Sequence, residues 1–267
     1  MKLYMSIFYC LTRLLSSSSH AAAMTTKACA NPKSGPAALI FLHGLGDTPA
    51  GWSSLEDMLP SIKPRLKQVK FVFPPSPTIP ITINGGATMP GWFDILDWPI
   101  GLKARDDPTG KLDSVSKIEQ EVSRLESEEG IPKNRIVVGG FSQGGAVALL
   151  AAYRSASAKE QSYAGCVSLS GWVTLKDDVI KNLSSSSSKN IPLFWGHGQY
   201  DDKVLFEQQA FGVNLLEENG VKVDARSYPV GHSSDPEEMR AMAEFLDDLL
   251  YGSCDDDVND TAAASAK

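Results

Sequence analysis

The chain has 267 residues, of which 42% are hydrophobic, 21% charged and 8% aromatic, as in a soluble protein with one sizeable core. Its net charge is −7 and it has no Lys/Arg-rich run, which argues against a nucleic-acid partner and strong docking on anionic membranes, while a transient membrane-surface contact stays open. No apolar run approaches the roughly 18 to 20 residues of a membrane span, so we expect no transmembrane segment.

The N-terminal segment, residues 1–33, is predicted to be a leader or a flexible extension. Lys2, the apolar stretch after it and the small residues 21–23 are typical of a secretory signal, whereas Arg13 and the serine run suit an organellar transit peptide. The alternative is a plain extension, with Met24 as a second start. We expect a cytoplasmic location, with organellar or secretory targeting left open by this leader.

Short apolar segments bounded by turn residues predict the strands of one buried sheet. They cover residues 37–42, 69–73, 135–140, 164–170 and 191–196. Residues 221–228 alternate between apolar and polar side chains, which indicates a further strand nearer the sheet edge.

Helical patterns fall between these strands. Apolar side chains recur at helical spacing in residues 115–125, 211–216 and 239–249, and Gly130 and Gly220 are predicted to end the first two helices. Alternating strands and helices predict a single α/β domain over residues 34–252, with a mostly parallel sheet and helices on both faces. The acidic tail that follows, residues 253–267, is expected to be disordered.

The four cysteines are widely scattered and none belongs to a C-x-x-C motif. They are Cys10, Cys29, Cys166 and Cys254. This pattern argues against a structural zinc site, a redox motif or a disulfide framework, and it fits a reducing compartment.

A G-x-S-x-G motif lies between the strand ending near residue 140 and the helix that follows. In Gly140-Phe141-Ser142-Gln143-Gly144, the serine is at the position of a nucleophile elbow, whose tight turn needs glycines on both sides. The alternative, a glycine-rich phosphate loop, lacks the G-K-[ST] lysine and the G-x-G-x-x-G spacing. We therefore predict that Ser142 is a catalytic nucleophile.

A serine nucleophile needs a base and an acidic partner, which follow it in the order Asp/Glu, then His, in this fold. His232 follows Ser142 by a long interval and is predicted to lie in a late loop, so it is the expected base. His20 lies in the leader. His43 and His197 follow predicted strands and are expected to be turn or scaffold residues.

Two adjacent carboxylates, Asp201 and Asp202, follow the strand over residues 191–196. The G-x-x-D-x-x-V spacing from Gly198 to Val204 favours Asp201 as the acid, and Asp202 is then a solvated loop residue or a helix cap. The oxyanion of the reaction needs two backbone N–H donors, for which we predict Gln143, next to the nucleophile, and Leu45, in the glycine-rich loop after the first strand. This chemistry requires no metal and no organic cofactor.

Four blocks carry a resemblance to a known family. FLHGLGDT, TMPGWFDI, GGFSQGGA and HGQYDDKV…GHSS, in this order within residues 37–250, are similar to the acyl-protein thioesterase/lysophospholipase family of α/β-hydrolases. The resemblance implies the same nucleophile, acid, base and oxyanion amides as above. Asp202 stands where the family often has proline, which leaves open which of the two carboxylates orients His232.

The resemblance also implies the substrates. Such enzymes cleave long-chain acyl groups from protein cysteines, and also lysophospholipids and simple esters, so the expected partners are S-acylated proteins or lipid-like esters. Residues 73–95 match a lid-like loop near the acyl groove, whose expected lining residues are Ile79, Ile81, Met89 and Trp92, with Trp172 as a further wall. The alternative is that these side chains only pack the loop. We expect a monomer or a weak dimer.

Two other functions stay open from the sequence. The first is a lysophospholipase or general carboxylesterase acting on oxygen esters, because a site built for these usually also cleaves thioesters. The second is a binding protein with an α/β-hydrolase fold, although such proteins have lost part of the catalytic triad.

Overall fold

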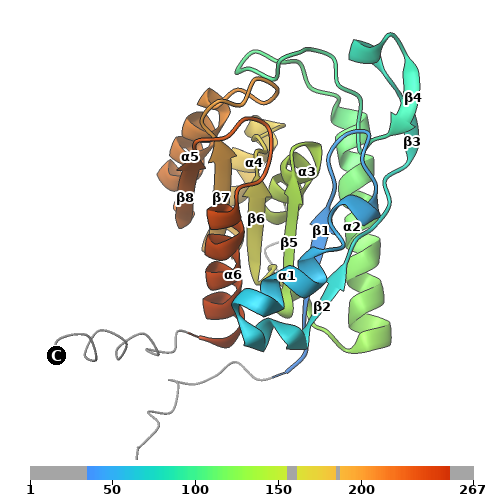
Figure 1. Ribbon diagram of the computed structural model, residues 1–267. Helices are drawn as coiled ribbons and strands as arrows, with labels where there is room; N and C mark the ends of the chain where they lie inside the picture. The colour runs from blue at the N-terminus through green and yellow to red at the C-terminus, as the bar shows by residue number, and fades with distance from the viewer. Residues whose placement is uncertain (1–34, 155–160, 185–186, 253–267) are drawn as a thin grey trace, which may run out of the picture.

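Six parallel strands form the central sheet of the protein, which the computed structural model describes over residues 35–154, 161–184 and 187–252. The strand order is β2-β1-β5-β6-β7-β8 (Figure 1). The strands are β1 (Ala37–Leu42), β2 (Val69–Val72), β5 (Ile136–Phe141), β6 (Gly165–Leu169), β7 (Leu193–Gly198) and β8 (Val223–Tyr228). Each predicted strand is present, and β8 lies at the sheet edge as its alternating pattern predicted.

Alternate side chains of β1 enter two separate cores, one on each face of the sheet. Ala38, Ile40 and Leu42 belong to the first core, whereas Ala37, Leu39 and Phe41 belong to the second. The first core is covered by α2 (Pro108–Glu129), α3 (Gln143–Tyr153), α4 (Lys176–Leu183) and α5 (Glu207–Glu218), and the second by α1 (Leu55–Ile62) and α6 (Pro236–Tyr251). Helices therefore cover both faces, which confirms the predicted fold class.

The helix ends follow local chemistry. Gly130 ends α2 in the left-handed conformation, with φ 65°, as the sequence predicted. Asp235 caps α6 by accepting from the amide of Glu237, and the Glu238 side chain accepts from the Asp235 amide in turn. The short helices α1 and α4 were not predicted.

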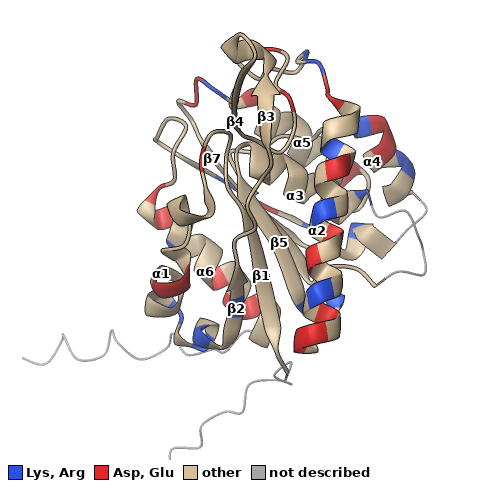
Figure 2. Ribbon diagram, turned by 90° about the vertical axis from the view of Figure 1, so that its right-hand side faces the viewer, with Lys and Arg blue, Asp and Glu red and all other residues tan. Residues whose placement is uncertain are grey.

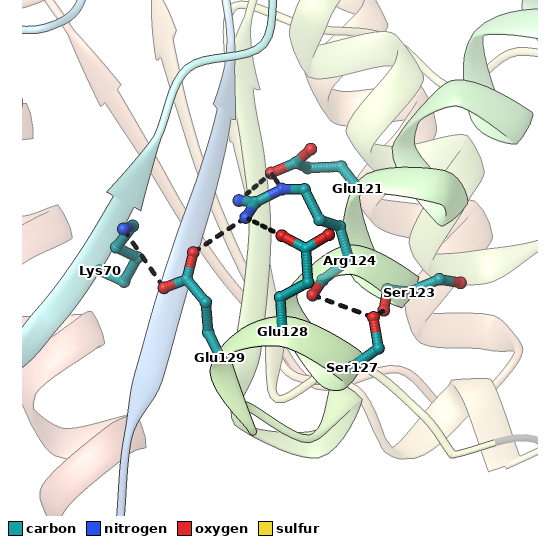
Figure 3. Close-up of polar contacts among 7 residues, drawn as sticks. All are labelled: Lys70, Glu121, Ser123, Arg124, Ser127, Glu128 and Glu129. Carbon is teal, nitrogen blue, oxygen red and sulfur yellow. Dashed lines mark hydrogen bonds and ion pairs between the residues drawn. The ribbon is translucent and has the colours of Figure 1, made fainter.

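A charged network links α2 to the edge strand β2. Basic and acidic residues alternate along α2 (Figure 2). Arg124 donates to Glu121 and to Glu129, at 2.7 and 3.0 Å, and the second carboxylate oxygen of Glu129 lies 3.2 Å from the Lys70 ammonium (Figure 3). Because these groups are exposed to solvent, water screens their charges and each pair contributes little to stability.

The segment predicted as a lid-like loop contains a small hairpin. Strands β3 (Thr78–Ile81) and β4 (Ala87–Pro90) pair antiparallel, and Gly85 and Gly86 at the turn have φ of 66° and 80°. The hairpin lies beyond the carboxyl ends of the parallel strands (Figure 1). Residues 73–95 are therefore partly regular structure at the end of the sheet where ligands bind in this class of fold.

The predicted leader, residues 1–33, and the predicted tail, residues 253–267, lie outside the described residues. The two ends of the described chain meet at Arg135, whose guanidinium donates to the carbonyl oxygens of Gly35 and Leu250 at 3.1 and 2.7 Å. None of the helices in the described ranges has both the length and the apolar character that crossing a bilayer requires.

Candidate active site

Ser142 occupies the sharp turn between β5 and α3. Its backbone has φ 54° and ψ −118°, a conformation that residues other than glycine rarely adopt. Its amide donates to the carbonyl of Leu169 at 2.8 Å. A Cβ atom added to Gly140 would lie 2.4 Å from the Gly144 backbone, and one added to Gly144 would lie 2.2 Å from the carbonyl oxygen of Leu42. Only glycine fits at both positions, which explains the G-x-S-x-G pattern.

Three predicted residues from three loops meet at the carboxyl end of the sheet. Nε2 of His232 lies 2.8 Å from Oγ of Ser142, and Nδ1 of the same ring lies 2.7 Å from Oδ2 of Asp201. Asp201 follows β7 and His232 follows β8, and these strands are neighbours in register from Leu193 to Gly198. The loops that leave them therefore emerge side by side.

The two candidate carboxylates have opposite environments. The Asp201 side chain is fully buried, with Oδ1 accepting from the amides of Lys203 and Val204 at 2.9 Å each. The Asp202 side chain is 72% exposed and pairs with the Lys203 ammonium at 3.0 Å. Burial alone would raise the pKa of Asp201, but hydrogen bonds from His197 and His232 outweigh burial and hold this pKa well below its usual range. Asp201, and not Asp202, faces His232.

The two remaining described histidines are buried at strand ends. Nε2 of His43 accepts from the Ser76 amide at 3.3 Å, so Nδ1 carries the proton and donates to the carbonyl of Gly44 at 2.8 Å. His43 therefore shapes the loop after β1. Nε2 of His197 lies 2.9 Å from the carbonyl oxygen of Val204 and 3.4 Å from Oδ2 of Asp201.

The predicted oxyanion donors, Leu45 and Gln143, line the same cavity as Ser142. Gln143 is the first residue of α3, where helix N–H groups lack intrahelical acceptors and favour negative charge. The Leu45 amide donates to no protein acceptor within the part of the chain that the structure describes. A Cβ atom on Gly44 would lie 3.5 Å from Cβ of Ser142, so the Leu45 loop runs close against the elbow.

The side chain of Gln143 has a role that the sequence did not reveal. It is buried, accepts from the Trp92 amide at 2.9 Å and donates to the Phe93 carbonyl at 2.6 Å. The Trp92 indole N–H donates to the carbonyl of His43 at 2.9 Å. These bonds fasten the segment after the hairpin to both the elbow and the β1 loop.

A cavity of about 260 Å³ opens beside Ser142 and His232. Its apolar walls come from Leu45, Ile95, Trp98, Ile100, Phe141, Trp172 and Val204, and its polar walls include Asp47 and Lys203. Of the five predicted groove residues, only Trp172 lines it.

The other four predicted groove residues are not among those that line the cavity. Ile81 and Trp92 are buried in the first core, the latter with its indole turned toward the His43 carbonyl. Ile79 and Met89 face each other across the hairpin and pack against the same core. Three of the seven apolar wall residues, Ile95, Trp98 and Ile100, come instead from residues 95–100, and none of these three was predicted to line the groove.

Groups suited to other chemistry are scarce in the described ranges. They contain no cluster of three or more His, Cys, Asp or Glu side chains that could hold a metal ion. Cys166, on β6, is a buried free thiol, and burial raises its pKa far above the ordinary range, so it does not supply a thiolate.

Proteins similar to this chain in sequence and in fold point to one family. A model of the phospholipase/carboxylesterase family matches residues 25–250. The acyl-protein thioesterase 1 of Mycosarcoma maydis is 39% identical over 236 residues, covering 82% of this chain and 95% of that protein. The crystal structure of Zea mays acyl-protein thioesterase 2 is 31% identical with a TM-score of 0.71, covering 83% of this chain and 97% of that one.

The crystal structure of Arabidopsis thaliana SOBER1 is 28% identical with a TM-score of 0.74, and the match covers 81% of this chain and all of that one. Sequence and fold agree over nearly all of the described residues. The chain therefore belongs to the phospholipase/carboxylesterase family of α/β-hydrolases and is a hydrolase acting on ester or thioester bonds.

Proposed function

We propose that the protein is a serine hydrolase that removes long-chain acyl groups from S-acylated proteins through a Ser142-His232-Asp201 triad. The observation that carries this proposal is the unbroken hydrogen-bond chain from Asp201 through His232 to Ser142, with bond lengths of 2.7 and 2.8 Å, beside an apolar cavity. Such a chain is what a serine hydroxyl needs to act as a nucleophile.

The geometry supports a two-step acyl transfer. Oγ of Ser142 attacks the acyl carbonyl carbon while Nε2 of His232 takes its proton, and buried Asp201 stabilises the imidazolium that forms. The backbone N–H groups of Leu45 and Gln143 hold the oxyanion. The bond from the carbonyl carbon to the leaving sulfur then breaks, and His232 gives its proton to that sulfur. In the second step water attacks the acyl carbonyl carbon while His232 takes a proton from it. The bond from that carbon to Oγ of Ser142 then breaks, Oγ regains the proton from His232, and the fatty acid leaves.

The substrate assignment rests on the cavity and on the relatives. The side chains of Ile95, Trp98, Ile100 and Trp172 offer an apolar surface for an acyl chain next to the nucleophile. A cysteine thiol, with a pKa near 8.5, leaves more readily than an alcohol. Relatives similar over most of their length, from Mycosarcoma maydis and Zea mays, bear the name acyl-protein thioesterase.

Hydrolysis of oxygen esters is the second candidate, either as a lysophospholipase or as a general carboxylesterase. The family description favours it, and the same nucleophile and oxyanion donors would serve. A pure binding role has less support, because Ser142, His232 and Asp201 are hydrogen-bonded in series.

A substrate panel tests this proposal. The protein and its Ser142→Ala variant are assayed with a palmitoyl-cysteine peptide, lysophosphatidylcholine and a short aryl ester. We expect the highest kcat/KM for the palmitoyl thioester and no turnover by the variant. Turnover of short esters alone would refute the thioesterase assignment, and preference for the lysophospholipid would support the second candidate.

A further inference from the structure

His197 lies at the end of β7, is fully buried and has one fixed tautomer. Its Nε2 is 2.9 Å from the carbonyl oxygen of Val204, which can only accept, so Nε2 carries a proton. Its Nδ1 has no hydrogen-bond partner within the described residues. The hydrogen bonding of this ring therefore goes through its Nε2–H.

The same N–H also faces the carboxylate of Asp201. Nε2 of His197 is 3.4 Å from Oδ2, the oxygen that accepts from Nδ1 of His232 at 2.7 Å. Two histidines therefore converge on one carboxylate oxygen, His232 with the shorter bond and His197 with an N–H shared with Val204. The other oxygen, Oδ1, is occupied by the amides of Lys203 and Val204.

Val204 is held through both its backbone amide and its backbone carbonyl. Its amide donates to Asp201 at 2.9 Å, and its carbonyl accepts from His197 at 2.9 Å. Val204 also pairs with Ile100, whose amide donates to the Lys203 carbonyl at 2.8 Å. Both Val204 and Ile100 line the cavity beside Ser142, whereas His197 does not.

We propose that His197 is a positioning residue for the hydrolysis, whose Nε2–H holds the Asp201 carboxylate and the Val204 carbonyl so that Oδ2 stays aligned with His232. It does not line the cavity beside Ser142, and it acts through Asp201 and Val204. This inference rests on the proposed function, in which Asp201 is the acid of the triad. The sequence indicated only a turn or scaffold role for this histidine.

The role predicts a particular kinetic effect. Misalignment of Asp201 weakens its stabilisation of the imidazolium in the transition state. The apolar walls that bind the acyl chain stay unchanged. A hydrogen bond to a charged group contributes about 1.5 to 3 kcal/mol, which corresponds to a fall in kcat of roughly 10- to 100-fold. We expect KM to change less than about twofold, because losing an interaction made only in the transition state lowers kcat and leaves KM unchanged.

Three variants separate positioning from packing. His197→Phe keeps a ring and removes the N–H, whereas His197→Gln keeps an N–H donor near the place of Nε2. Trp195→Phe is the matched control, since Trp195 is equally buried on the same strand and its indole N–H has no partner within the described residues. The rate of hydrolysis of a short aryl ester is divided by the concentration of sites that a fluorophosphonate labels at completion. Only folded molecules with a reactive site are then counted.

We expect kcat per labelled site to fall in His197→Phe and to stay within about threefold of wild type in both His197→Gln and Trp195→Phe. Proton NMR gives a readout independent of turnover: the strongly deshielded Nδ1 proton of His232 should persist in His197→Gln and move to higher field in His197→Phe. A wild-type kcat in His197→Phe, or equal losses in the Phe and Gln variants, would overturn the inference.

Ser142→Ala and Asp201→Asn are assayed in parallel to keep the two proposals apart. If both lose activity and His197→Phe does not, only the positioning role fails. If Ser142→Ala or Asp201→Asn keeps its activity, the proposed triad fails, whatever the His197 variants do.

Discussion

The hydroxyl of Ser142 lies 2.8 Å from Nε2 of His232, although 90 residues separate them in the chain. This approach depends on the parallel sheet, because the loops after β5, β7 and β8 all leave at the same edge. The turn at Ser142, with its positive φ, aims the hydroxyl at that meeting point. The predictions below follow from this arrangement and its surroundings.

The two neighbouring aspartates should differ strongly in their effect on turnover. Asp201→Asn should lower kcat by about 10⁴, since the amide would support the wrong tautomer of His232. Asp202→Asn should leave kcat within about twofold, because its carboxylate is largely exposed and pairs with the Lys203 ammonium. Steady-state kinetics on both variants measure this, and a larger loss in Asp202→Asn would move the acid role to that residue.

The Gln143 side chain should matter for stability. Gln143→Ala leaves the Trp92 amide and the Phe93 carbonyl without their buried partner, which should cost about 2 to 5 kcal/mol of unfolding free energy. Urea denaturation measures the loss. Gln120→Ala, at an exposed position on α2, is the control and should change stability by less than about 0.5 kcal/mol. Equal stability of the two variants would show that the Gln143 bonds do not hold the segment.

Glu238 should make stability depend on pH. Burial raises the pKa of this carboxyl from 4.5 to about 7, so the folded protein binds its proton more tightly than the unfolded chain. Stability from this group is full below pH 4.5 and is lost as pH rises from 4.5 to about 7, by roughly 3 kcal/mol.

Glu238→Gln removes this loss while keeping an oxygen for the Asp235 amide. The variant should therefore gain stability relative to wild type between pH 5 and pH 8, measured by urea denaturation at both values. A difference between the two proteins that does not change with pH would contradict the assignment.

Trp98 should select for long acyl chains. Its side chain lines the cavity and is 48% exposed, so Trp98→Ala removes apolar wall at little cost in stability. We expect kcat/KM for a palmitoyl ester to fall about tenfold and that for an acetyl ester to stay within twofold. Met58→Ala is the control, because Met58 is also exposed and apolar but lies on α1, away from the cavity. A similar loss in the control, or equal losses on both esters, would exclude an acyl-binding role for Trp98.

The strands and the sharp turn at Ser142 were predictable because their sequence patterns are local. An apolar run such as residues 37–42, bounded by turn residues, is a local pattern, and so is the G-x-S-x-G motif, in which a Cβ on Gly140 would clash with the Gly144 backbone. Helices α1 and α4 escaped prediction because each has eight residues and few buried side chains, and α1 contains Pro60. Asp201 could be preferred to Asp202 from spacing alone, but its burial was not visible in the sequence.

The cavity walls were predicted poorly because they depend on contacts between distant segments. Residues 95–100 reach the site through the bridge between Ile100 and Val204, which no local pattern indicates. Trp92 resembled a wall residue in the sequence, yet its indole N–H finds an acceptor at His43, which turns the ring into the core. The second role of Gln143 also depends on partners about 50 residues away.

The most direct test of the central claim is covalent labelling of the full chain with a fluorophosphonate, followed by peptide mass spectrometry. An activated hydroxyl reacts with such a probe, so we expect one phosphonate per molecule on Ser142, and none in Ser142→Ala. An unlabelled wild-type protein, or a label on another residue that persists in Ser142→Ala, would contradict it.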